Sequence, residues 1–166
     1  MTRLSFAIVP LALATLALNS AAAVAESAQN PMTFFEGRTE SVSTVKVVMK
    51  KPMLSRSIGR GQILPDGSLT LVQRVEEGDR KPFERRWKIR KVGPGRYAGT
   101  MSEAKGQVTI DEIGERYRFR FTMKGNLLVE QWLTPLPGGK AASTKVTIKK
   151  FGMAVAKAEG TIRKIG

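Results

Sequence analysis

The chain has 166 residues, with 28 Lys and Arg against 14 Asp and Glu, which gives a formal net charge of +14 at pH 7. It contains no cysteine, which excludes disulfides and cysteine nucleophiles, and no histidine, which excludes histidine-based catalytic triads and the usual zinc sites. Stability must therefore come from a packed core, and we expect neither a metal site nor a cofactor.

The first 25 residues have the order typical of a secretory signal peptide. Arg3 supplies a positive charge, residues 4–18 form a mostly apolar run, and Ala23-Val24-Ala25 gives a small-residue cleavage pattern before Glu26. The apolar run is shorter than the roughly 20 residues that span a membrane. We therefore expect cleavage near Ala25 and a mature protein that is periplasmic or secreted.

Alternation of apolar and charged residues recurs along the rest of the chain and predicts β-strands with one buried face. The clearest strands are expected within residues 45–50, 69–75, 83–90, 107–111, 116–124 and 145–149. Turns rich in Gly, Pro, Asn and Asp separate them, and residues 31–36 are the candidate for a short helical turn. The pattern predicts an all-β protein of about 8–10 antiparallel strands.

An antiparallel sheet of this size tends to close, because closure removes the edges that invite aggregation. We therefore predict a signal peptide at residues 1–25, a loose leader at residues 26–32, and an up-and-down β-barrel domain over residues 33–166. A two-sheet sandwich is the alternative, although the long crossover that would mark it is not evident.

Successive side chains of a strand point to opposite faces of the sheet, so the alternating apolar positions of each strand are assigned to the barrel interior. The apolar members are Leu69, Leu71, Val75, Trp87, Ile89, Val108, Ile110, Tyr117, Phe119, Phe121 and Met123. Such an interior either holds a hydrophobic or amphipathic small molecule or is filled by its own side chains. The residues predicted to bind a ligand are Gln73, Arg85, Trp87, Tyr97, Tyr117, Phe119, Phe121 and Trp132.

Arg85 shares the face of Phe83, Trp87 and Ile89 instead of the charged face of its strand. An unpaired charge in an apolar interior is costly, so three explanations remain open. The guanidinium reaches water at the barrel mouth, pairs with an interior carboxylate such as Glu130, or binds the anionic head group of a ligand.

Two rows of basic residues occupy the opposite, outward faces. They are Arg86, Lys88 and Arg90 on one strand and Arg116, Arg118 and Arg120 on another. These rows are either ordinary solvated faces or a surface that docks on an anionic membrane or envelope polymer. Nucleic acid, the usual partner of so basic a chain, is not expected outside the cytoplasm.

Carboxylates gather near two predicted turns, within residues 76–79 and 111–115. Acidic residues at turns are usually solvated, so we assign no catalytic residue. An enzyme that uses carboxylates is the third hypothesis for this chain.

Several sequence landmarks occur in a characteristic order. They are residues 34–38 (FFEGR), the Asp66-Gly67 turn before residues 69–71 (LTL), residues 85–89 (RRWKI), residues 95–99 (GRYAG), Trp132, and residues 150–152 (KFG). Over residues 33–165 this order resembles an uncharacterised lipocalin-like family of bacterial envelope proteins, known as a domain of unknown function. The resemblance implies a lipocalin-like (calycin-type) barrel and no established activity.

The sequence therefore predicts an exported, non-enzymatic lipocalin-like protein that binds a hydrophobic or amphipathic small molecule, including an anionic one, in its barrel. The alternative is an envelope interaction protein with a filled barrel, whose basic surface docks on anionic lipids or polysaccharide.

Overall fold

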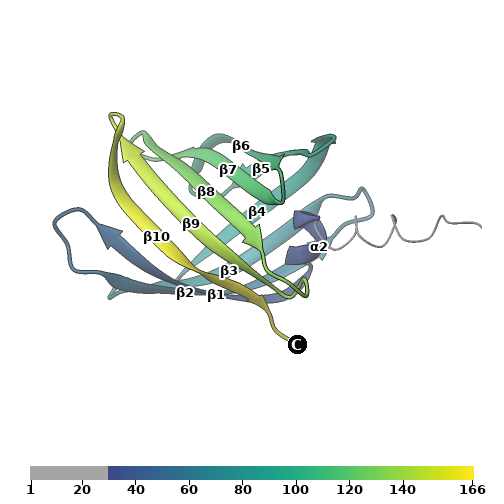
Figure 1. Cartoon of the computed structure of the whole chain (residues 1–166), viewed down its shortest axis with the longest axis horizontal. Helices are drawn as coiled ribbons and strands as arrows, with labels where there is room; N and C mark the ends of the chain where they lie inside the picture. Colours follow the sequence, from purple (N-terminus) through teal and green to yellow (C-terminus); the bar gives the residue numbers. More distant parts are fainter. Residues whose placement is uncertain (1–29) are drawn as a thin grey trace, which may run out of the picture.

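The computed structural model describes residues 30–166 and shows a closed barrel of ten antiparallel strands (Figure 1). The elements are α2 (Pro31–Phe35), β1 (Gly37–Val47), β2 (Met53–Ile63), β3 (Leu69–Glu77), β4 (Phe83–Gly93), β5 (Arg96–Met101), β6 (Ala104–Ile113), β7 (Arg116–Met123), β8 (Leu127–Pro135), β9 (Ala141–Lys150) and β10 (Met153–Lys164). The predicted all-β barrel and the short helix near residue 31 are confirmed. The predicted signal peptide lies outside the described residues.

Each strand pairs with its neighbours in the chain, and β1 also pairs with β10. That last pairing runs from Thr39 opposite Lys164 to Val47 opposite Ala156, so the sheet has no free edge. The predicted strand at residues 45–50 is wrong at its end, because β1 stops at Val47 and Met49 lies in the following turn with φ 62°. The alternation there continues by chance into a hairpin.

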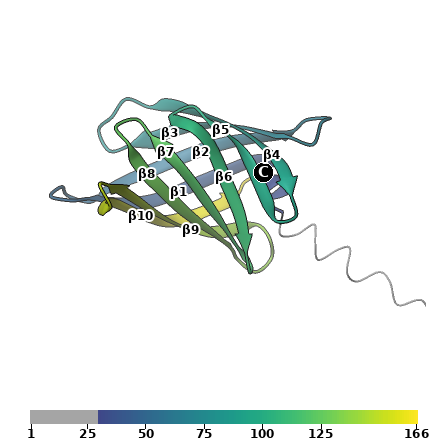
Figure 2. The same cartoon turned by 90° about the horizontal axis from the view of Figure 1, so that it is seen from above.

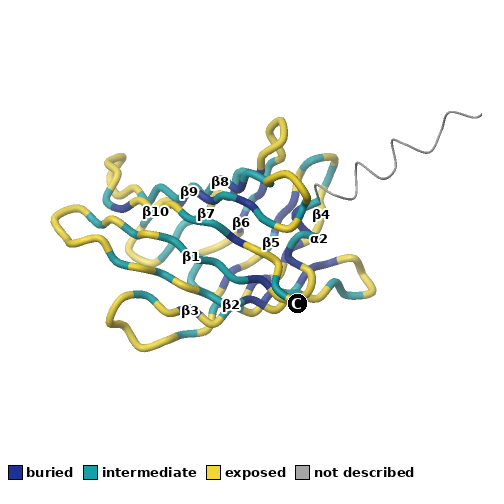
Figure 3. The backbone as a smooth tube through the Cα atoms, turned by 60° about the horizontal axis from the view of Figure 1, so that its bottom comes forward, coloured by how far each residue is buried: buried dark blue, intermediate teal, exposed yellow. Residues whose placement is uncertain are grey.

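The up-and-down connections divide the turns between two ends of the barrel (Figures 1 and 2). The helix end contains α2 and the turns at residues 64–68, 94–95, 114–115 and 136–140. The hairpin end contains the turns at residues 48–52, 78–82, 102–103, 124–126 and 151–152. Hairpins at the second end are largely exposed in Figure 3, whereas the buried backbone gathers nearer to α2.

The helix end of the barrel is filled by a continuous apolar core. Leu69, Val108, Ile110 and Leu133 are each at most 1% exposed. Of the eleven apolar residues that parity assigned to the interior, nine are buried, and Phe121 and Met123 are partly buried. The period-2 pattern therefore identified most of the core, and it failed at Met49, where the alternation with lysines runs into a turn.

The short helix α2 closes this end of the barrel. The side chain of Asn30 accepts a hydrogen bond from the Met32 N–H at 2.9 Å and caps the helix, and Pro31 suits the first turn. Met32 and Phe35 are 4% and 7% exposed because they enter the core. Gly61 on β2 makes this possible, since a Cβ there would collide with the Phe35 carbonyl oxygen.

Candidate functional site

Trp87 is the aromatic centre of the barrel interior. Its indole Nε1 donates a hydrogen bond to Gln73 Oε1 at 2.8 Å, from the neighbouring strand β3. Its ring meets those of Phe119 and Phe121 edge to face, with centroids 6.4 and 5.9 Å apart. These contacts hold the indole in one orientation, with its polar edge satisfied inside the barrel.

Arg85 also points inward, next to Gln73 in the ladder between β3 and β4. Its Nε and Nη2 donate to the two carboxylate oxygens of Glu103 at 2.7 and 2.9 Å, and the guanidinium lies 5.6 Å from the centre of the Phe83 ring. The side chains of Arg85 and Glu103 are 28% and 29% exposed. Of the three explanations for Arg85, the structure therefore shows pairing with a carboxylate at a solvent-accessible position.

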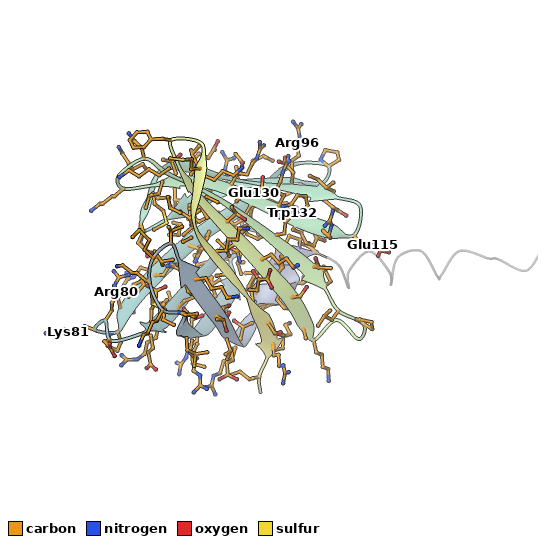
Figure 4. The ribbon with its side chains drawn as sticks, turned by 60° about the vertical axis from the view of Figure 1, so that its left-hand side comes forward. Arg80, Lys81, Arg96, Glu115, Glu130 and Trp132 are labelled. Atoms are coloured by element: carbon orange, nitrogen blue, oxygen red, sulfur yellow. The ribbon has the colours of Figure 1, made fainter. Side chains whose placement is uncertain are left out.

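The expected partner of Arg85 was wrong. Glu130 lies on the outer face of β8, where its carboxylate accepts a hydrogen bond from Trp132 Nε1 at 3.1 Å (Figure 4). Glu103 was missed because it lies in the tight turn between β5 and β6, outside any alternating pattern. The sequence signal that could have identified Glu103 as the partner of Arg85 was an acidic residue in a turn next to the strand that carries an inward arginine.

Trp132 is likewise placed on the opposite side from the one predicted. It stands opposite Arg118 in the β7–β8 ladder, and the guanidinium carbons of Arg116 and Arg118 lie 4.5 and 5.8 Å from its ring centroid. The inward residues of β8 are instead Val129, Gln131 and Leu133. Trp132 therefore lies on the outer face of β8, where its ring makes cation–π contacts with two arginines, and it does not line the interior.

The structure also separates the two tyrosines from Arg85. Tyr97 and Tyr117 are 4% and 3% exposed in the filled helix end. Burial, with a smaller contribution from Glu112, raises the pKa of Tyr117 well above its ordinary value. The predicted ligand-binding residues that do come together are Gln73, Arg85, Trp87, Phe119 and Phe121.

A wall of small side chains forms another part of the interior. The inward positions of β1 and β2 include two opposed serine pairs, Ser41 with Ser57 and Ser43 with Ser55. On β10 the inward positions continue the wall with small residues, as where Gly160 stands opposite Ser43. Sequence analysis missed this wall because serine and glycine give no apolar signal.

Burial of the inward residues changes along the barrel axis. Most of those toward the helix end are buried, with Ile63 only partly so, whereas many of those toward the hairpin end are only partly buried although they face inward. Val75 and Val129 are buried exceptions in the hairpin half. Examples at the hairpin end are Ser43, Ser55, Gln73, Arg85 and Phe121. Eight-stranded barrels are either filled by their own side chains or hold one small ligand, and ten strands enclose a wider interior.

The outward basic rows are partly neutralised within the protein. Arg86 pairs with Glu84 at 2.6 Å, and Arg118 and Arg120 both reach Asp111, at 3.4 and 3.1 Å. Lys88 and Arg90 are exposed. Docking of these rows on anionic polymers stays a prediction.

The acidic turns hold no catalytic arrangement that the structure singles out. Glu76 and Glu77 pair with Arg74 and Arg80, at 3.6 and 2.8 Å. Residues 30–166 contain no group of three or more acidic side chains placed to bind a metal ion. Over the same residues, no helix is long and apolar enough to cross a bilayer.

A shallow hollow of about 400 Å³ lies on the outside of β6 to β9. Its lining includes Thr109, Arg120, Glu130, Thr147 and Lys149, which belong to the outward faces of these strands. Its charged lining residues are Arg120 and Lys149 against Glu130, and Arg120 is already paired with Asp111 at 3.1 Å.

Comparison with known proteins supports the fold. No family model matches the chain, and no curated protein matches it either. Among solved structures, an S-type phycobiliprotein lyase from Guillardia theta is similar at a TM-score of 0.63, with 8% identity over 81% of this chain and 91% of that chain. A protein of unknown function of the DUF3598 family from Nostoc punctiforme gives a TM-score of 0.53, with 12% identity over 82% of this chain and 50% of that one.

At these identities the likeness shows the architecture alone. The protein is a lipocalin-like β-barrel, and its fold neighbours include a family without a known function. The more specific resemblance to a family of bacterial envelope proteins stays a prediction.

Proposed function

We propose that the mature protein is exported and binds one small amphipathic molecule in the hairpin end of its barrel. The observation that carries the proposal is the contrast along the barrel axis. Most inward side chains are buried at the helix end, and most at the hairpin end are only partly buried, with Val75 and Val129 as buried exceptions. This contrast supports an open cup above a filled floor.

The apolar part of the ligand would contact Trp87 and Phe121 on one side and the small-residue wall of β1, β2 and β10 on the other. Each methylene group transferred there from water contributes about 0.8 kcal/mol. The filled helix end limits the depth of the cup, so a short or compact apolar group fits better than a long extended chain.

The polar head of the ligand would lie at Arg85 and Glu103. Because Glu103 already balances the guanidinium, the pair carries little net charge while it still presents hydrogen-bond donors and acceptors. This arrangement favours a head group that both donates and accepts over a bare anion. An uncharged glycerol ester is therefore a better probe than a fatty acid of the same length.

The two tryptophans provide an internal test. Trp132→Phe leaves the inward Trp87 as the reporter, and Trp87→Phe leaves the outward Trp132. Titration with monocaprin, and with caprate for comparison, should change the fluorescence of Trp132→Phe and leave that of Trp87→Phe unchanged. Native mass spectrometry of the mature chain should show one bound monocaprin. Equal responses of the two variants, or no adduct, would contradict the proposal.

A filling substitution separates an open cup from a filled barrel. Ser57 faces inward opposite Ser41 and Val75, so Ser57→Leu places a larger side chain in the proposed cup. We expect monocaprin affinity to fall at least about tenfold while stability is kept, because the added leucine gains contacts in empty space. In a filled barrel the same change would cost about 1–3 kcal/mol of stability.

A further inference from the structure

Two hairpins at the open end carry an unusual concentration of exposed apolar side chains. They are residues 46–54, between β1 and β2, and residues 149–157, between β9 and β10. Met49 is 99% exposed, Phe151 85% and Met153 67%, which are the three highest values among the exposed large hydrophobic residues described. Val48 and Leu54 are exposed by 59% and 55% on the same hairpins.

The two hairpins lie side by side. The β1–β10 ladder ends at Val47 opposite Ala156, and the Val48 N–H then donates to the Val155 carbonyl oxygen at 3.0 Å. Both tips project from the same end of the barrel, and in Figure 1 they diverge from these adjacent bases, with the β1–β2 tip at the left and the β9–β10 tip at the top. We term residues 46–54 and 149–157 together the twin tip.

Backbone conformation shows that these apolar residues are not favoured by the turns themselves. Met49 has φ 62° and Phe151 has φ 50°, in the left-handed region that favours Gly, Asn or Asp. A bulky side chain in that region is strained, and here it gains no burial in return. Both turns thus present a large apolar side chain at the position where local stability favours a small or polar one.

Charge gives the twin tip a second property. Its six lysines are all exposed, and residues 46–54 and 149–157 contain no acidic residue. The lysines are Lys46, Lys50, Lys51, Lys149, Lys150 and Lys157. None forms an ion pair within the described part of the chain, in contrast with Arg86, Arg118 and Arg120 of the outward rows. Apolar tips flanked by unpaired lysines match a bilayer surface, which offers hydrocarbon below anionic head groups.

We propose that the twin tip docks the protein on anionic lipid bilayers, with Met49 and Phe151 inserted among the acyl chains and the lysines at the phosphate level. The docking is separate from ligand binding in the barrel, because the tip side chains lie outside the interior. In this orientation the open end of the barrel faces the membrane.

The test uses the mature chain and sedimentation with vesicles of phosphatidylcholine alone or mixed with phosphatidylglycerol. We expect binding to the mixed vesicles and much weaker binding to the neutral ones. Met49→Asn with Phe151→Asn should lower the partition coefficient at least about tenfold, because two apolar side chains no longer enter hydrocarbon. Asparagine tolerates positive φ, so the thermal midpoint of this variant should be unchanged or higher.

Two matched controls locate the surface. Val92→Thr with Leu136→Gln removes two exposed apolar side chains from the helix end and should leave vesicle binding unchanged. Lys50→Gln with Lys150→Gln should weaken binding to the mixed vesicles. Lys88→Gln with Arg90→Gln, which removes equal charge from the side of the barrel, should have a smaller effect.

Three results would overturn the proposal. The first is wild-type binding by the double asparagine variant. The second is greater sensitivity to the Lys88 and Arg90 changes than to the Lys50 and Lys150 changes. The third is a wild-type protein that does not bind vesicles but self-associates, with the self-association abolished by the double asparagine variant. That result would make a second copy of the chain the occupant of the twin tip.

Discussion

Gly61 allows the helix α2 to enter the barrel, and its substitution by alanine tests how the helix end is held. The Cβ that Gly61→Ala adds would occupy the position of the Phe35 carbonyl oxygen. Strand β2 cannot retreat, because Gly61 pairs with Gly37 on one side and Leu71 on the other. The helix must therefore leave its site, and Met32 and Phe35 lose their burial.

The expected cost follows from those two side chains. Full exposure of a buried Met or Phe costs about 1.5–3 kcal/mol each, so Gly61→Ala should lower the free energy of unfolding by about 3–6 kcal/mol. Urea unfolding measures this loss. Hydrogen exchange should also show that the Phe34 amide, which donates to the Asn30 carbonyl at 3.1 Å, loses protection.

A double-mutant cycle supplies the control. With Met32→Ala and Phe35→Ala already in place, α2 contributes little, and Gly61→Ala should then cost far less than it does in the wild type. The reasoning would be refuted by a loss under about 1 kcal/mol in the wild type, within the range of an ordinary surface change. An equal loss in both backgrounds would refute it as well.

Three further predictions concern the interior. Gln73→Leu leaves Trp87 Nε1 without its acceptor and should lower the free energy of unfolding, measured in urea, by about 1–3 kcal/mol. Glu103→Gln should destabilise the protein more than Glu84→Gln does, because exposed pairs are worth about 1 kcal/mol or less and the pair of Glu103 is the less exposed. Burial raises the pKa of Tyr117 above its ordinary 10.0, so the folded state holds that proton more tightly than the unfolded state does. The free energy of unfolding should therefore fall as pH rises above about 10. Tyr117→Phe should reduce this fall in alkaline unfolding curves.

Much of the fold followed from strands with one charged face. On β4 and β7, arginines and lysines alternate with aromatic residues, and this alternation assigned Trp87 and Phe119 to the interior correctly. Parity fails where both faces carry mixed residues. On β8 the run Glu130-Gln131-Trp132 has no clear alternation, and only the pairing with β7 shows that Gln131 faces inward.

The candidate site was harder to predict for a different reason. The wall of the proposed cup consists of serines, glycines and alanines, whose inward orientation comes from the register of β1, β2 and β10. The partner of Arg85 comes from a turn, since Glu103 follows the end of β5. Both features depend on contacts between segments that are distant in the chain, which one-dimensional patterns do not contain.

The pairing of β1 with β10 has a consequence for how the protein folds. The first strand cannot complete its hydrogen bonds until the last strand, Met153–Lys164, has arrived. Until then, the growing sheet has two unpaired edges that can join other chains. Ring closure across nearly the whole sequence is also entropically costly, so we expect slow folding and a requirement for protection from aggregation before the final strand is in place.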